Sequence, residues 1–376
     1  MPLPFASSTR SVREVFPRVP PIKFHLPSEA LPIPEQLVGL ELEMENVPSR
    51  LYRTPIPNWT THQDGSLRGS GIEFVTDGPI CGDVIPEAID ALIERVRTTV
   101  PSPSTLSSFR TSTHVHLDFT RAAPYSHGIP ADSYNNAKQF VLSYYALEDN
   151  FFRVAGEPRR MSGYCFPFSY VPADLVKFLA SNRATNPARY YGCNFNSLGK
   201  YGTVEFRHLP LVTEAAPLMR WVRALMKLKR FTYLHCLGNS PDVDFLERND
   251  GLEQMAQYVF EEFPANIRAV DHAVVRKRMD VLAARLEYVM DKPEQPAAEE
   301  PNEPSVPDFG INTGEADRRV FEAARRIFEA PSVPRNRAEA VRVRPVEQWA
   351  TVNSSTLPEL TPSGWDEAED NRNGSI

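Results

Sequence analysis

Apolar residues alternate with polar ones throughout residues 37–45, and this pattern constrains the fold more than any other feature of the chain. The apolar positions are Val38, Leu40, Leu42 and Met44, and the positions between them are Gly39, Glu41, Glu43 and Glu45. A period of two puts successive side chains on opposite faces of a β-strand, so we predict a half-buried strand. Glu41 and Glu43 would then lie about 7 Å apart on one face. Like charges at that distance need water or a cation to balance them.

Three later segments repeat this arrangement, with one apolar face and one face of chemically active side chains. They are residues 71–76, 113–119 and 203–207. Their polar positions are Glu73 in the first, His114, His116 and Asp118 in the second, and Glu205 and Arg207 in the third. The last segment follows a glycine-containing turn at 199–202, so we expect Asn194 and Asn196 on the other strand of a hairpin.

The polar faces of these four strands share an unusual composition. A solvated sheet face normally mixes charged residues with serine and threonine, but these faces carry mostly Glu, His and Asp, with one arginine and no lysine. So many carboxylates and imidazoles on one face are costly unless divalent cations balance them. Because zinc sites prefer histidine and cysteine, a set dominated by carboxylates indicates Mg²⁺ or Mn²⁺.

Helical periodicity marks four segments between and after the predicted strands. They are residues 86–97, 136–154, 214–234 and 268–290. We expect these helices to cover the apolar face of the sheet and to leave its polar face as a concave cleft. The predicted fold class is therefore α+β, with a largely antiparallel sheet, helices on one face and a metal-binding cleft on the other.

Proline content divides the chain into three parts. Eight prolines in residues 1–36 disfavour helices and strand ladders, which predicts an extended arm. Residues 37–290 hold all the predicted strands and have the size of one large domain. Residues 291–376 begin with an acidic, proline-interrupted linker and continue as a polar tail, with one amphipathic helix predicted at 316–330.

Charge and composition argue against several classes of protein. The net charge of −7 disfavours a nucleic-acid partner and a polybasic membrane anchor. The longest apolar runs fall well short of the roughly 18 residues that a membrane span needs, and residues 1–30 lack a signal-peptide pattern. The four cysteines are far apart and form no CxxC pair. We therefore expect a cytoplasmic protein with reduced cysteines.

Four motifs, in this order, resemble the amidoligase family of phages, bacteria and fungi. They are Gly39-Leu40-Glu41-Leu42-Glu43, Gly71-Ile72-Glu73-Phe74-Val75-Thr76, His114-Val115-His116 and Thr203-Val204-Glu205-Phe206-Arg207. This family belongs to the carboxylate–amine ligase superfamily of glutamine synthetase and glutamate–cysteine ligase. The similarity covers roughly residues 37–235. It implies a sheet of the glutamine-synthetase-like type whose cleft holds ATP and Mg²⁺ or Mn²⁺.

The resemblance also implies two sets of metal ligands. The first set is Glu43, Glu73 and, from the preceding loop, Asp64. The second set is Glu41, His114 and Glu205. Carboxylates dominate both sets, as the composition of the strand faces also indicates.

Four further residues gain roles from the resemblance. His116 would contact ATP near its phosphates. Arg207, beside Glu205, would face the transferred phosphoryl group or the substrate carboxylate. Arg160 lies in a segment similar to an arginine-bearing stretch of the family, and it would bind an anion in the substrate site. Asn194 matches a further family position, which we assign to the substrate.

The activity implied by the resemblance is ATP-dependent formation of an amide bond through an acyl phosphate. The substrates would be a small-molecule or peptide carboxylate and an amine, carried by an amino acid, a peptide or a protein. Phosphoryl transfer needs cations and arginines to neutralise the phosphate oxygens, and the two metals, Arg207 and Arg160 would supply them. The chain contains no GxxxxGK[ST] loop, so metals and arginines would hold ATP. A protein partner for the proline-rich ends is a further expectation.

Two other classes of function remain open at this point. His114-Val115-His116-Leu117-Asp118 also resembles the metal-binding strand of zinc amidohydrolases, for which His208, His235 and Asp271 would have to supply later ligands. That alternative leaves four glutamates of the strand faces without a role, namely Glu41, Glu43, Glu73 and Glu205. The other alternative is a catalytically inactive ligase fold that serves as a structural or interaction module through its proline-rich ends.

Overall fold

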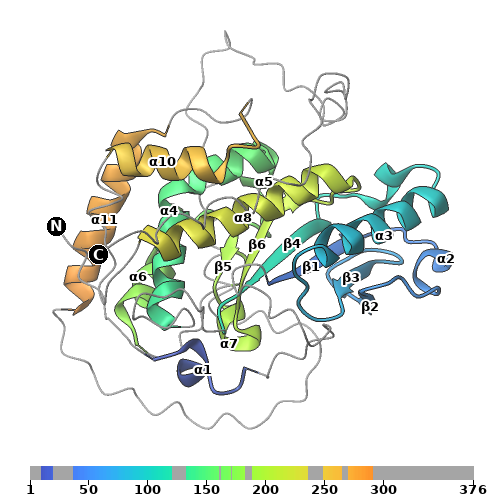
Figure 1. Cartoon of the computed structure of the whole chain (residues 1–376), viewed down its shortest axis with the longest axis horizontal. Coiled ribbons are helices and arrows are strands. Elements are labelled where there is room, and N and C mark those ends of the chain that lie inside the picture. The colour runs from blue at the N-terminus through green and yellow to red at the C-terminus, as the bar shows by residue number, and fades with distance from the viewer. Residues whose placement is uncertain are drawn as a thin grey trace, which may run out of the picture. The chain divides into compact units, whose positions relative to one another are not determined.

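The computed structural model describes residues 10–19, 37–120, 133–160, 162–170, 172–182, 189–235, 249–264 and 270–290. Within these residues a layer of helices packs against a six-stranded sheet with the order β2-β3-β1-β4-β6-β5 (Figure 1). The strands are β1 (Val38–Met44), β2 (Trp59–Gln63), β3 (Ile72–Thr76), β4 (Ser112–Asp118), β5 (Cys193–Asn194) and β6 (Thr203–Pro210). Every neighbouring pair is antiparallel. The predicted α+β class and antiparallel sheet are thus confirmed.

The register of the sheet aligns the polar residues of its central strands. Glu43 on β1 pairs with Glu73 on β3, and Glu41 pairs with His114 on β4. Further along β4, His116 pairs with Glu205 on β6. Paired residues in neighbouring strands point to the same face. The strands therefore bring polar side chains from distant parts of the chain into one row across the sheet. We call this row, which contains Glu41, Glu43, Glu73, His114, His116 and Glu205, the polar row.

Four long helices correspond to the predicted helical segments. They are α3 (Val84–Thr99), α4 (Tyr134–Ala155), α8 (Ala215–His235) and α11 (His272–Met290). The structure adds shorter elements, which are α1 (Val12–Val15), α2 (Ser49–Tyr52), a 3₁₀ turn (Pro103–Leu106), α5 (Glu157–Arg160), α6 (Ala173–Ala180), α7 (Ser197–Tyr201) and α10 (Asn249–Val259). α8 contacts α3, α4 and β4, and α4 contacts β6. Helices therefore cover the apolar face of the sheet, as predicted.

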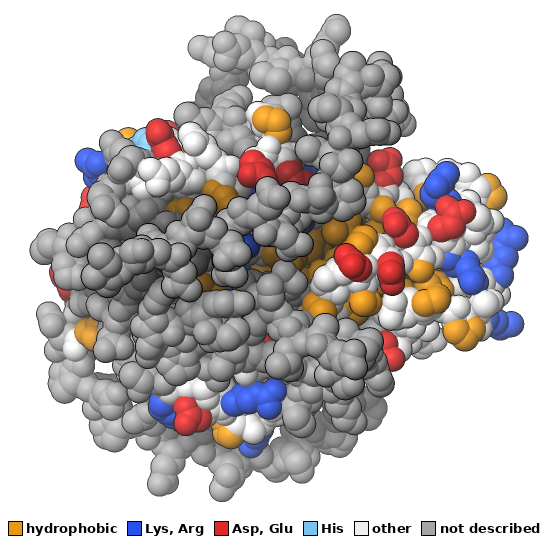
Figure 2. All heavy atoms as spheres, in the orientation of Figure 1, with side chains coloured by type: hydrophobic (Ala, Val, Ile, Leu, Met, Phe, Trp, Pro, Cys, Tyr) orange, Lys and Arg blue, Asp and Glu red, His pale blue; other side chains and the backbone are white. Residues whose placement is uncertain are grey.

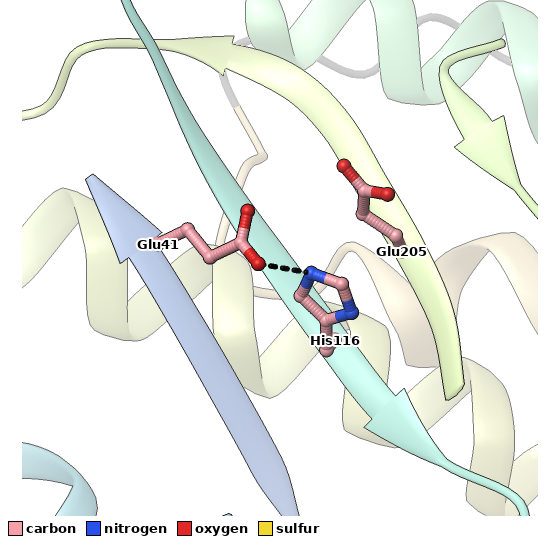
Figure 3. A group of neighbouring side chains, drawn as sticks. All are labelled: Glu41, His116 and Glu205. Carbon is pink, nitrogen blue, oxygen red and sulfur yellow. Dashed lines mark ion pairs between the residues drawn. The ribbon is translucent and has the colours of Figure 1, made fainter. Parts of the chain in front are cut away.

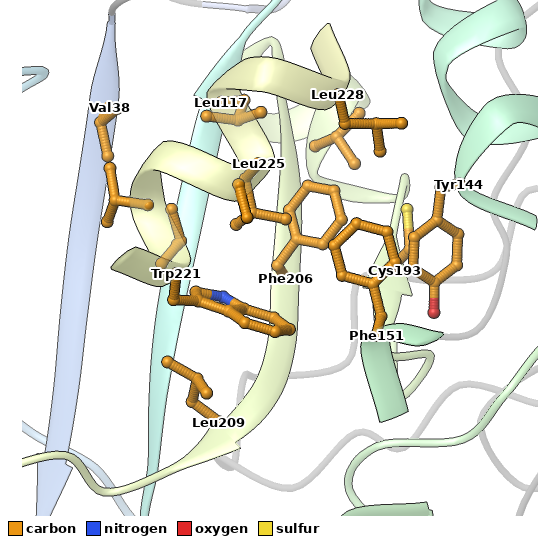
Figure 4. Close-up of a cluster of buried hydrophobic side chains, with 14 of the residues drawn as sticks. Val38, Leu117, Tyr144, Phe151, Cys193, Phe206, Leu209, Trp221, Leu225 and Leu228 are labelled. Atoms are coloured by element: carbon orange, nitrogen blue, oxygen red, sulfur yellow. The ribbon is translucent and has the colours of Figure 1, made fainter. Parts of the chain in front are cut away.

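The main core lies between α8 and the central strands. Trp221, Leu225 and Leu228 of α8 are fully buried, and in Figure 4 they lie beside Leu117 of β4 and Phe206 of β6. The spacing of three and four residues puts all three α8 side chains on one helix face. The apolar face of the sheet is closed by this packing, which leaves its other face for the polar row.

The hairpin predicted before β6 contains an unexpected turn of helix. β5 pairs with β6 as expected, but α7 occupies the connection instead of a simple turn. α7 ends at Gly202, which has a φ of 73° in the left-handed region that favours glycine. A Cβ at this position would lie 2.0 Å from Cγ2 of Thr120, so the position also has no room for a side chain.

Residues 10–19 differ from the extended arm predicted for residues 1–36. Ser11 caps α1 in a capping box with Glu14, and the N–H of Tyr134 donates to the carbonyl of Arg10 at 2.8 Å. The apolar residues of this segment are buried, namely Val12, Val15, Phe16 and Val19. The prediction of an extended arm is wrong for these residues. A short helix with apolar residues is stable when it packs on a surface, and the start of α4 together with α7 provides that surface.

Two other sequence predictions fall outside the described residues. These are the linker and tail of residues 291–376, with the helix at 316–330, and the remainder of the N-terminal arm. None of the described helices is both long and apolar enough to cross a lipid bilayer. On the face in Figure 2, acidic and basic side chains are interspersed over the end of the domain that contains α3.

Candidate metal centre

One group of neighbouring ligand atoms comes from the three central strands. Glu41 of β1, His116 of β4 and Glu205 of β6 each offer an atom, and these atoms lie within 4.8 Å of one another (Figure 3). Nε2 of His116 lies 3.0 Å from Oε1 of Glu41. Burial opposes the charge on Glu41, yet the neighbouring His116 and His114 hold the pKa of its carboxyl well below its usual range. Glu41 is therefore a carboxylate at neutral pH.

The second group lies on β1, β3 and the loop before β3. Its members are Glu43, Asp64 and Glu73, whose ligand atoms also lie within 4.8 Å of one another. Burial and the charges of Glu41, Glu43 and Asp64 raise the pKa of Glu73 to about 8. The loop is held in a turn because Oδ1 of Asp64 accepts a hydrogen bond from the N–H of Ser66 at 2.7 Å. These residues are the same three that the motif resemblance groups around one metal.

His114 lies between the two groups and has partners on both ring nitrogens. Nδ1 lies 3.1 Å from Oε2 of Glu41 and 3.3 Å from Oε1 of Glu205. Nε2 lies 2.7 Å from Oγ of Ser112, which also donates to Glu43. His114 thus connects the two carboxylate groups.

The structure groups a different histidine with Glu41 and Glu205 from the one that the resemblance assigns to them. The sequence places His114 with Glu41 and Glu205 as a ligand and gives His116 to ATP, whereas the structure groups His116 with the two glutamates. Ser112 and the two glutamates occupy the nitrogens of His114. Nε2 of His116 is buried and faces Oε1 of Glu41 at 3.0 Å without hydrogen-bond geometry, so this nitrogen is able to coordinate an ion beside Glu41. The ATP contact of His116 stays a prediction.

Arg207 follows Glu205 on the same face of β6. It donates one hydrogen bond to Oε1 of Glu205 and another, from Nε, to the carbonyl of Tyr164 at 3.2 Å. Burial opposes the charge of Glu205, but Arg207 and then His114 keep the pKa of this carboxyl below its usual value. The guanidinium therefore belongs to the polar row, where the sequence predicts it.

Arg160 lies in a different environment from the polar row. Its Nη1 donates to Oδ1 of Asp149 on α4 at 2.8 Å, and its guanidinium lies over the ring of Phe152. The preceding residue, Arg159, is buried and donates to the backbone carbonyls of Arg207 and His208 at 2.7 and 2.9 Å. Arg159 thus supports β6 directly, while the anion-binding role of Arg160 stays a prediction.

Three polar residues orient the candidate ligands. Nδ2 of Asn194 donates to Oε2 of the candidate ligand Glu205 at 2.6 Å, while the substrate contact of Asn194 stays a prediction. Oγ1 of Thr203 lies 2.9 Å from Nδ1 of His116, and Ser112 contacts Glu43 and His114. The sequence analysis missed Ser112 and Thr203, although both stand two residues from a predicted ligand and so share its strand face.

The close approach of His116 explains why the first motif begins with a glycine, Gly39. It pairs with His116 across β1 and β4. A Cβ at Gly39 would lie 3.3 Å from Cβ of His116, which is tighter than ordinary contact. The missing side chain therefore leaves space for the imidazole to reach Glu41.

The zinc-hydrolase alternative needs later metal ligands, and neither His208 nor Asp271 lies in the polar row. His208 follows Arg207 on β6 and points to the opposite, helix-covered face, where its Nε2 lies 2.8 Å from the hydroxyl of Tyr144. Asp271 caps the start of α11 by accepting from the N–H of Val274. The side chain of His235 lies outside the described residues. The alternation of β6 thus separates His208 from His114 and His116.

The donor set fits a hard divalent cation in each group. Five carboxylates and one imidazole form the two groups, and oxygen-rich sets of this kind suit Mg²⁺ or Mn²⁺. The buried Nε2 of His116 meets Oε1 of Glu41 without hydrogen-bond geometry, and the carboxylates around Glu73 repel one another. Both features are relieved by a cation at these positions.

Comparison with models of known protein families and with curated proteins finds no match for this chain. The resemblance to the amidoligases therefore depends on the four strand motifs. The structure brings the polar residues of these motifs together on one sheet face.

Proposed function

We propose that the protein is an ATP-dependent carboxylate–amine ligase with a sheet of the glutamine-synthetase-like type. One observation carries this proposal: two groups of metal-type ligands lie side by side on one sheet face, and Arg207 is attached to one of them. Activating a carboxylate with ATP requires charge neutralisation around the transferred phosphoryl group. Paired cations and a fixed guanidinium are suited to that task.

Each part of the polar row would have a separate task. Glu41, His116 and Glu205 would hold one cation, and Glu43, Asp64 and Glu73 the other. These cations would neutralise the phosphate oxygens of bound ATP. Arg207 would orient the phosphoryl acceptor, because Glu205 and the carbonyl of Tyr164 fix its guanidinium. Ser112, Thr203 and Asn194 would keep the ligands in position.

The reaction class requires two bond exchanges. The substrate carboxylate oxygen attacks the γ-phosphorus of ATP, and ADP leaves. The amine nitrogen then attacks the acyl carbon, phosphate leaves, and the nitrogen loses a proton. The net products are an amide, ADP and phosphate. The two exchanges explain why a ligase of this class needs both cations and an arginine beside the transferred group.

The decisive experiment measures ADP and phosphate release with Mg²⁺ in the presence of pooled amino acids and cell-wall peptides. We expect release that depends on a carboxylate and an amine, and an amide product whose mass equals that of both substrates minus water. Glu43→Gln should abolish release. Thr61→Ala, on the exposed face of edge strand β2, should not. A protein that binds zinc, cleaves amides and ignores ATP would contradict the proposal.

A further inference from the structure

A groove lies beside α11. None of the residues that line it belongs to the polar row. Its volume is about 470 Å³. Its walls are Tyr145 of α4, the segment around Ser169, Tyr170 and Pro172, and five residues of α11, which are Val274, Lys277, Arg278, Val281 and Arg285. Nothing in the proposed ligase reaction uses these residues.

The groove is basic. Arg278 forms an ion pair with Asp149 at 2.7 Å, so its charge is balanced. Within the described part of the chain, Lys277 and Arg285 have no carboxylate within ion-pair distance. Three cations therefore line the groove, and two of them have no ion-pair partner among the described residues, which suits an acidic ligand.

The same side of α11 is also apolar. Val274 is 38% exposed, Val281 is 43% exposed and Tyr288 is 65% exposed. They are spaced seven residues apart, which puts them in one line along the helix. An exposed line of this kind beside a basic groove indicates a docking surface for a segment that is both acidic and apolar.

The chain itself continues from α11 with such a segment. Residues 291–304 contain five carboxylates, one lysine and four prolines, in the sequence Asp291-Lys292-Pro293-Glu294-Gln295-Pro296-Ala297-Ala298-Glu299-Glu300-Pro301-Asn302-Glu303-Pro304. Two PxxP patterns, at 293–296 and 301–304, favour a polyproline II conformation. Such segments dock in grooves lined by aromatic rings, and the partly exposed Tyr170 lines this one.

The length of the segment allows it to cover the groove. α11 from Val274 to Met290 spans about 24 Å at the helical rise per residue. Fourteen residues in polyproline II conformation span about 43 Å. The chain can therefore reverse direction after Met290 and run back along α11 past Arg285 and Lys277. Covalent attachment also gives the segment an effective concentration in the millimolar range.

We propose that residues 291–304 dock in the groove of the same molecule, with a proline on the ring of Tyr170 and their carboxylates on Lys277 and Arg285. A second copy of α11 is a poorer occupant, because it would bring the same cations into contact. The docked segment fixes the start of the C-terminal tail to the catalytic domain.

Carbodiimide cross-linking of the full chain tests this docking, because it joins an amine to a carboxylate in direct contact. An equal mixture of ¹⁴N- and ¹⁵N-labelled protein distinguishes contacts within one molecule from contacts between molecules. We expect cross-links from Lys277 to carboxylates of 291–303 in which both peptides carry the same isotope. Their yield should be at least about tenfold above the yield of cross-links from the exposed Lys200 to the same carboxylates. Arg285→Glu and the uncharged change Tyr170→Ser should each lower this yield at least about fivefold.

The matched control is Arg230→Glu on the exposed side of α8, which should leave the yield unchanged. Isotopically mixed cross-links would show that a second copy occupies the groove, which overturns the proposal. Equal yields at Lys277 and Lys200, or a yield indifferent to Arg285→Glu and Tyr170→Ser, would also overturn it. The measurement is independent of ligase activity, so a negative result leaves the proposed function intact.

Discussion

Asn194 on β5 donates a hydrogen bond of 2.6 Å to Oε2 of Glu205 on β6, while Arg207 binds the other carboxylate oxygen. Both oxygens of this candidate ligand are thus fixed before any ion binds. Groups that orient a metal ligand typically change metal affinity by 10- to 100-fold when they are removed.

We therefore expect Asn194→Ala to weaken Mn²⁺ binding by about tenfold or more while the domain stays folded. Titration calorimetry with Mn²⁺ measures the affinity, and circular dichroism checks the fold. Thr61→Ala on β2 is the control that changes a polar residue outside the row. An unchanged Mn²⁺ affinity in Asn194→Ala would show that Glu205 is not a ligand.

Glu205→Gln and Glu43→Gln should have different effects on the metal-free protein. Glu205→Gln removes the charge that pairs with the largely buried Arg207, so we expect a loss of about 2 kcal/mol in the free energy of unfolding. Glu43→Gln removes one like charge from a crowded group, so the free energy of unfolding should hold or rise. Urea denaturation in EDTA compares the two variants. Equal destabilisation would indicate that Glu43 is a structural residue.

The pKa of Glu73 predicts how the stability of the metal-free protein depends on pH. Folding raises this pKa from 4.5 to about 8. A raised pKa stabilises the folded state fully below the unfolded value, and this contribution is lost as the pH rises through 8. We expect wild-type melting temperature in EDTA to fall between pH 5 and pH 8 relative to that of Glu73→Gln. Added Mg²⁺ should reduce the difference. Parallel pH profiles for the two proteins would contradict the assignment.

Arg207→Lys tests the role of the guanidinium. Lysine keeps the charge but cannot bind Glu205 and the carbonyl of Tyr164 in the same planar geometry. We expect kcat to fall about 100-fold with little change in the KM for ATP, because the lost interaction acts on the transition state. Arg68→Lys is the matched control, since Arg68 forms a similar fork on Glu45. A uniform rise in KM would assign Arg207 to binding alone.

Phe16→Ala tests the docking of residues 10–19. Phe16 is 6% exposed and packs edge-on against Tyr134, so its truncation should cost about 3 kcal/mol of unfolding free energy. Phe109→Ala is the control, because Phe109 is 66% exposed. Thermal denaturation of both variants measures the difference. If both variants melt like the wild type, the N-terminal helix does not contribute to the fold.

Alternation in the sequence predicts the central strands and their faces well. Burial of one face imposes a period of two on β1, β3, β4 and β6, and this period is visible in the sequence of each strand without knowing which strands lie beside it. Strand β2 was missed because its residues after Trp59 are exposed polar residues that carry no alternation. α1 was missed because its burial depends on residues far along the chain, while the local prolines indicate an arm.

The candidate site is predictable in part for the same reason. The glutamates and histidines follow from strand faces, and the register places them together, whereas Asp64 lies in a loop and was included only through the resemblance. The grouping of His116 with Glu41 and Glu205 is not visible in the sequence, because it depends on how the two imidazoles are oriented, for example by the contact of His114 with Ser112. Contacts such as that between Asn194 and Glu205 depend on side-chain rotamers, which no periodicity records.

The docking site of α1 sets an order of events during synthesis. Phe16 and Val19 pack beside Gly199 and Gly202, which are made about 180 residues later. At roughly 5–20 residues per second, this delay is about 10–40 s. During that interval the apolar side of the nascent N-terminal segment has no surface to cover it, and so it is open to chaperones.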